Sequence, residues 1–145
     1  MAIFNPFNQF TEDLHHGVHN FTNTASAVPT IALCAAANAP VATNSVLANL
    51  TEIAYTNLST RAVTITSSAQ TSGTYKLVLA DLILSASGGA VATFRYVVLY
   101  ADAPTSPADP LIGWYDFGSD VTLLDTQSLT VDFDGVGGVF TDAFA

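Results

Sequence analysis

Residues 128–134 read "SLTVDFD", and apolar side chains alternate with polar ones along the stretch. In an extended strand Leu129, Val131 and Phe133 lie on one face and the polar residues between them lie on the other. This pattern is typical of a strand that packs one face on a core and exposes the other to water. The stretch therefore predicts an outer strand of an antiparallel sheet.

A second stretch, "FRYVVLY" at residues 94–100, is apolar on both faces. Val97 and Leu99 share one face with Arg95, and the opposite face carries four aromatic or aliphatic side chains. Neither face is suited to contact with water. We expect a central strand or a strand at a subunit interface, and Arg95, Val97 and Leu99 are candidate interface residues.

The chain after Pro29 consists of short strand-like segments separated by turn-forming residues such as "NAP", "SGG" and "DGVGG". No helix-length pattern interrupts these segments, which disfavours parallel α/β folds. The expected fold is all-β, with an antiparallel β-sandwich or jelly-roll-like domain over residues 29–145.

Residues 1–28 are expected to form a helical or extended N-terminal arm. Apolar residues recur there every three or four positions, as on one stripe of a helix: Phe7, Phe10, Leu14, Val18 and Phe21. Asn5 before Pro6 is the N-cap signal, and Gly17 weakens the helix without forbidding it. We expect Phe4, together with Phe7, Phe10 and Leu14 of the stripe, to contact an adjacent subunit.

The composition is unusually poor in charge. Half of the residues are hydrophobic and only 10% are charged, compared with about 25% charged in an ordinary soluble domain. So few charges predict that much of the exterior is buried against other protein, in a homo-oligomer that we expect to be a trimer.

Several classes of partner are disfavoured by the same composition. No run of about 18 apolar residues predicts a membrane-spanning helix, and the start of the chain does not resemble a signal peptide. The chain has twelve acidic and three basic residues, for a net charge of −9. Because the basic residues are isolated, we expect no direct binding to nucleic acid.

All three histidines fall in "EDLHHGVHN", residues 12–20. A helix would place His15 and His19 on one face, a spacing that can hold zinc with a third ligand. No further histidine exists, no cysteine is near, and the glutamate of the H-E-x-x-H motif is absent. We expect scaffold histidines on the wet side of the arm and no metal site.

No catalytic site or cofactor is expected. Cys34 is interpreted as a small buried apolar residue. The aspartates of "DFDGVGG", residues 132–138, resemble the start of a calcium loop but lack its later ligands, so a tight hairpin turn is expected. Asp116 and Asp120 could serve a glycosidase, but carboxylates at turn edges are common in acidic β-proteins.

The aromatic segment "GWYDFG", residues 113–118, has two interpretations. Trp114, Tyr115 and Phe117 could together form a platform for sugar binding. The interpretation that we favour places Trp114 and Phe117 in the core, with Tyr115 and Asp116 covering the rim.

The segments "FRYVVLY", "DPLIGWYDFG" and "VDFDGVGGVFT" resemble a family of small structural proteins of tailed bacteriophages. The resemblance extends over most of the chain and implies a virion component. Because the start of the chain does not resemble a signal peptide, we expect synthesis in the cytoplasm of the host bacterium. The resemblance carries no catalytic or ligand-binding residues. It also does not fix the position on the particle, since head decoration proteins, minor tail proteins and fibre attachments all include small β-domains.

Composition favours one of these positions. Marked acidity suits an outer location away from packaged DNA, and low charge suits a symmetric oligomer present in many copies. We expect a non-enzymatic decoration or cement protein on the head exterior that bridges subunits of the major capsid protein. The alternative is a tail or fibre component that binds a receptor or glycan.

Overall fold

The computed structural model describes residues 2–22 and 28–144. In these residues the chain is all-β, with antiparallel sheets and one short α-helix, which confirms the expected fold class. The elements in order are β1 (Asn5–Pro6), α1 (Asn8–His15), β2 (Pro29–Cys34), the 3₁₀ turns η1 (Ala36–Asn38) and η2 (Leu47–Asn49), β3 (Ile65–Thr71), β4 (Thr74–Leu79), β5 (Leu82–Ser85), β6 (Phe94–Ala101), β7 (Leu111–Val121), β8 (Ser128–Val131) and β9 (Phe140–Ala143).

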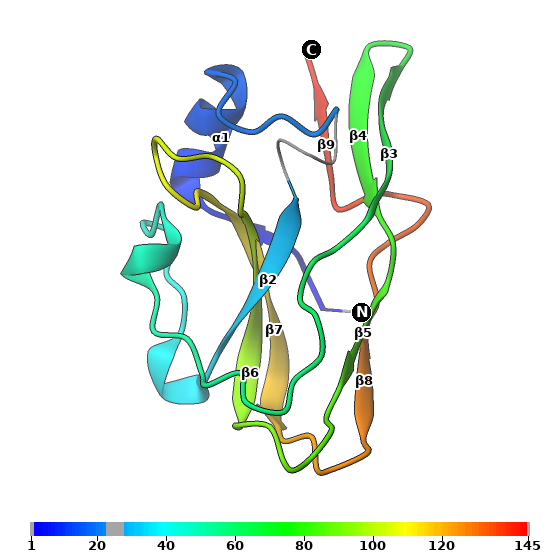
Figure 1. Ribbon diagram of the computed structural model, residues 1–145. Coiled ribbons are helices and arrows are strands. Elements are labelled where there is room, and N and C mark those ends of the chain that lie inside the picture. The colour runs from blue at the N-terminus through cyan, green and yellow to red at the C-terminus, as the bar shows by residue number, and fades with distance from the viewer. Residues whose placement is uncertain (1, 23–27, 145) are drawn as a thin grey trace.

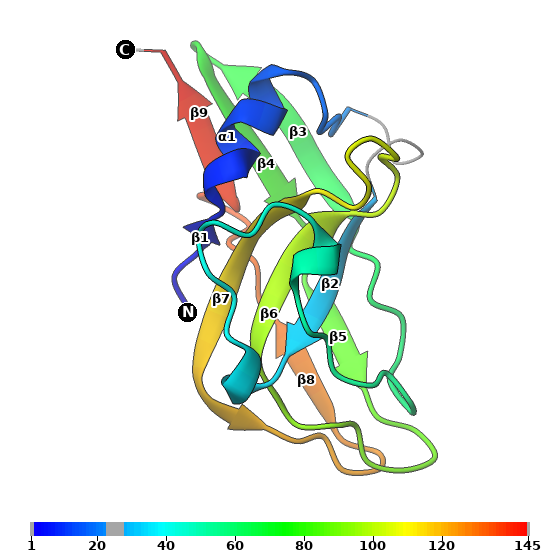
Figure 2. The same cartoon turned by 90° about the vertical axis from the view of Figure 1, so that its left-hand side faces the viewer.

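The largest sheet has four strands in the order β1-β7-β6-β2. The stretch "FRYVVLY" is β6, between β7 and β2, so the prediction of a central strand is confirmed. Residues 41–58 cover the face of this sheet that is turned away from the other strands (Figures 1 and 2). They are tied to the sheet by the N–H of Leu111, which donates to the carbonyl of Ser45, and by the N–H of Ile53, which donates to that of Leu33. The chain itself therefore buries both apolar faces of β6.

The remaining strands lie on the opposite side of the four-stranded sheet (Figure 1). They form a three-stranded sheet, β3-β4-β9, and a two-stranded sheet, β5-β8. In β8 and the residues after it Val131 and Phe133 are buried while Thr130 and Asp132 are exposed, as the alternation predicts. Because these strands do not form one continuous second sheet, the sandwich or jelly-roll arrangement stays a prediction.

The N-terminal helix is shorter than predicted. Asn5 is no N-cap, because Asn5 and Pro6 are extended and pair with β7, and the helix starts after Phe7. It ends at His15 because Gly17 adopts φ +75°. The N–H of Gly17 donates to Leu14 and that of Val18 to Asp13, the bonding pattern of a glycine-terminated helix.

The N-terminal segment belongs to the hydrophobic core, which corrects the expectation of a free arm. Phe7 is 1% exposed and Phe10 4%, and Phe4 and Leu14 are half-buried against the same core. An adjacent subunit cannot reach the two buried phenylalanines without unfolding the segment. The prediction that Phe7 and Phe10 are exposed and contact an adjacent subunit is therefore wrong.

The interface prediction on β6 needs the same correction. Val97 is fully buried and Leu99 is 1% exposed, because β6 lies between β2 and β7 and both side chains belong to the hydrophobic core. Arg95 is half-exposed and is bound to Asp116 of the neighbouring strand.

No helix of the described residues is long and apolar enough to cross a membrane.

Candidate functional site

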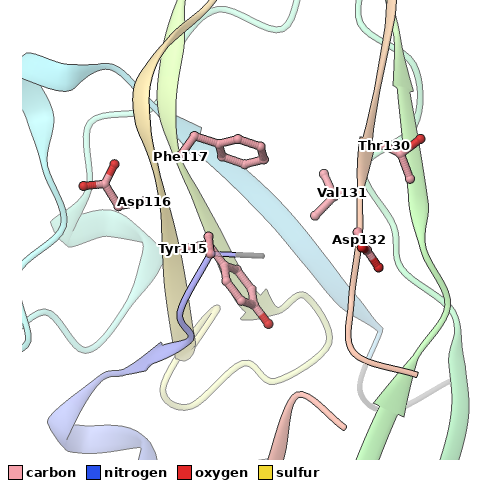
Figure 3. A pocket seen from close by; sticks show the side chains of 7 residues that line it. Tyr115, Asp116, Phe117, Thr130, Val131 and Asp132 are labelled. Carbon is pink, nitrogen blue, oxygen red and sulfur yellow. The ribbon is translucent and has the colours of Figure 1, made fainter. Parts of the chain in front are cut away.

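A hollow of about 440 Å³ lies between β7 and β8, where the four-stranded and two-stranded sheets separate (Figure 3). It is lined by Ala2, Tyr115, Asp116, Phe117, Thr130, Val131 and Asp132. The alternation of each strand decides which side chains enter it. Phe117 and Val131 point toward each other across the hollow, whereas Thr130 turns away from it.

Tyr115 provides the polar group inside the hollow. Its ring packs on Phe133 at 6.0 Å and on Phe4 at 5.5 Å between centroids. Burial, with a smaller contribution from the charge of Asp134, raises the pKa of Tyr115 to about 12. The phenol therefore keeps its proton at neutral pH and can donate a hydrogen bond to a ligand.

Asp116 contributes little to the hollow, although it lies at its edge. Arg95 donates two hydrogen bonds of 2.8 and 3.0 Å to the carboxylate of Asp116, and the N–H of Gly118 donates a third. These bonds, led by the one from Arg95, hold the pKa of Asp116 below its usual value. Figure 3 shows the carboxylate pointing away from Tyr115 and Phe117. The ion pair joins β6 to β7.

Trp114 faces the opposite side of β7 from Tyr115 and packs on Phe7, with ring centroids 4.6 Å apart. The platform of three aromatic residues considered from sequence therefore does not form. Tyr115 and Phe117 share the hollow, and Trp114 is half-buried against the core. That β8 lines this hollow was not predicted from the sequence, although the alternation in residues 128–134 indicated which of its side chains face inward.

His15 and His19 do not share a surface. The exposed His15 lies 2.8 Å from the carbonyl of Thr11 through Nδ1, and its Nε2 lies 3.9 Å from Asp142. His19 lies beyond the helix and is buried, so the expectation of a histidine on the wet side is wrong for this residue. The described residues contain no group of three or more His, Cys, Asp or Glu side chains placed to hold a metal ion.

Cys34 is completely buried in β2. Burial, helped by the charge of Glu52, raises its thiol pKa to about 11. Arg61 stacks on Tyr55, 3.7 Å from the ring centroid, and donates to the carbonyl of Ile31, which also belongs to β2. The interpretation as a buried apolar residue is confirmed, and the protonated thiol is a poor nucleophile.

The segment "DFDGVGG" forms a turn, as predicted, but not the tight hairpin turn that was expected. Asp134 accepts hydrogen bonds from the N–H groups of Val136 and Gly137, which lower the pKa of its carboxyl. The turn joins β8 to β9, which belong to different sheets, so it does not close a hairpin.

Comparisons with known proteins add no family to this description. A scan against protein-family models, a search of curated proteins and a search of solved structures each found no match to the chain.

Proposed function

We propose that the protein is a non-enzymatic structural component of a phage particle. In this proposal it sits on the head exterior as a homo-oligomer and bridges subunits of the major capsid protein. The resemblance of its β-segments to small phage structural proteins supports the proposal, and so does the net charge of −9, which disfavours a position facing packaged DNA.

The observation that carries the proposal is the exposed apolar surface. Large apolar side chains are exposed at positions spread along a sequence with few charges: Ile3, Val41, Ile83, Leu124, Val136 and Phe144. The most exposed are Ile3 (80%), Val136 (84%) and Phe144 (87%). Small separate contacts of this kind suit a protein that touches several neighbours weakly, because repetition within an oligomer adds strength. These side chains replace the buried phenylalanines as the proposed contacts.

A head-binding assay tests this proposal. Purified protein is mixed with phage heads that lack it, and the bound fraction is measured after sedimentation. We expect the triple variant Ile3→Ser, Val136→Ser, Phe144→Ser to lose most of its binding. Its free energy of unfolding should change by no more than about 0.5 kcal/mol per site, because all three side chains are exposed.

The matched control substitutes exposed polar residues, Thr43→Ser and Thr71→Ser, and should bind as the unmodified protein does. Normal head binding by the triple variant would contradict the proposed contacts. Failure of the unmodified protein to bind heads would contradict the proposed function itself.

The hollow between β7 and β8 favours a second candidate, a tail or fibre component that binds glycans. Phe117 offers an aromatic ring and Tyr115 a hydroxyl donor, a combination suited to a neutral sugar. Titration with neutral oligosaccharides, followed by NMR, should then shift the amide signals of β7 and β8. Phe117→Ala should abolish the shifts, whereas Phe144→Ala should leave them unchanged. Absence of shifts at millimolar sugar would remove this candidate.

A further inference from the structure

His19 is a buried imidazole without a hydrogen-bonding partner. It is 5% exposed, and neither ring nitrogen has a partner among the described residues. Its ring stacks on Phe21 at 5.7 Å and meets the edge of Phe10 at 5.0 Å. One carboxylate oxygen of the buried Asp13 is unpartnered as well. Such groups are rare in folded proteins and need an explanation.

Aromatic residues around His19 pack against the segment that follows α1 and hold it in place. Residues 16–22, here called the histidine turn, carry His19 and Phe21. Phe140 of β9 contacts Phe21 at 6.0 Å and Phe10 at 5.0 Å between centroids, so the turn closes over an aromatic cluster. Beside it a hollow of about 340 Å³ is lined in part by Leu14, His19 and Tyr75. Water can reach the cluster from this hollow once the turn lifts.

We propose that the histidine turn is an acid-sensitive latch, which is closed while His19 is neutral and opens when His19 is protonated. A proton on a ring held between two phenyl groups without an acceptor is costly, and leaving the cluster returns the charged ring to water. Opening uncovers Phe10 and Phe140 and therefore adds apolar surface to the protein.

The titratable groups near His19 only partly offset the effect of burial on its pKa. Asp13 of α1 favours the charged imidazole through its own charge, whereas burial acts more strongly and lowers the pKa of His19 from 6.5 to about 4. Tyr75 of β4 and Asp142 of β9 line the same hollow, and Asp142 lies 3.9 Å from His15. His19 binds a proton more readily in the open turn than in the closed turn. The fraction of open turn therefore increases as the pH falls from 6.5 to about 4.

Hydrogen exchange of the Val18 amide measures the latch, because this amide donates to the carbonyl of Asp13 in the closed turn. After correction for intrinsic exchange, we expect its protection to fall by about two orders of magnitude between about pH 7 and about pH 4. The emission of Trp114 should stay constant over the same range, since its contact with Phe7 lies outside the turn.

Two variants distinguish the effect of protonating His19 from the effect of protonating neighbouring groups. His19→Phe keeps an aromatic ring and removes the proton, so its Val18 protection should not depend on acid. His15→Gln, the exposed control, should lose protection as the unmodified protein does. The imidazole NMR signals of His19 in the unmodified protein need no variant and should remain those of a neutral ring down to about pH 5.

Three results would overturn the proposal. Equal loss of protection in His19→Phe would assign the effect to Asp13 or Asp142. A parallel change in Trp114 emission would mean that the whole protein unfolds. A charged His19 ring while Val18 stays protected would mean that protonation does not open the turn.

Discussion

Gly113 is a position where the sheet has no room for a side chain. A Cβ there would collide with the ring of Phe4 and would lie 2.8 Å from the carbonyl oxygen of Asn5. We expect Gly113→Ala to push β1 away from β7 and to lower the free energy of unfolding by about 1–3 kcal/mol, as overpacking does. Chemical denaturation measures this change.

Gly135 supplies the matched control for that substitution, because nothing lies within 4 Å of a Cβ at this position. Gly135→Ala should change the free energy of unfolding by less than about 0.5 kcal/mol. Equal effects of the two substitutions would mean that Phe4 and Asn5 do not pack on Gly113 as described.

Sequence reasoning worked best at the residues whose burial follows from strand alternation. Val131 and Phe133 were placed correctly because a strand has only two faces. It failed at His19, which a longer helix would have exposed. Burial of His19 depends on where the helix ends and on contacts with Phe10 and Phe21. Both of these rings pack on Phe140, which lies more than a hundred residues away in the sequence.

The helix illustrates the same limit for a whole element. The spacing of Phe7, Phe10 and Leu14 predicted a helix correctly, but its end was misplaced because Gly17 was treated as a weak helix residue. A glycine followed by an apolar residue is also a helix-stop signal. The pairing of β1 with β7 joins distant parts of the chain, and no local pattern predicts it.

Phe7 tests whether the N-terminal segment belongs to the folded body. Because its ring is buried against Trp114, we expect Phe7→Ala to lower the free energy of unfolding by about 3–5 kcal/mol. Phe144→Ala is the matched control, since Phe144 is exposed, and it should have little effect. Denaturant unfolding distinguishes the two.

Deletion of the residues before Asn20 should likewise destabilise the whole domain, because it removes both Phe7 and Phe10 from the core. If the truncated chain, or Phe7→Ala, unfolded at the same denaturant concentration as the full chain, the N-terminal segment would be a separate arm after all.

For the whole molecule we expect a homo-oligomer, with a trimer as the preferred form. Residues 41–58 already cover β6, so the expectation now depends on the scarcity of charge and on the exposed apolar side chains. Sedimentation at micromolar concentration should show a single species larger than the 15.1 kDa chain. A stable monomer under these conditions would contradict the expected oligomer.

The proposed position on a phage particle is the central claim at this scale, and electron cryomicroscopy of intact virions of a phage whose genome encodes the chain tests it most directly. The account predicts density that fits the β-domain on the outer surface of the head, repeated with the capsid symmetry and contacting more than one capsid subunit. Ile3, Val136 and Phe144 should lie at those contacts. Density for the domain on the tail alone, or its absence from the virion, would contradict the account.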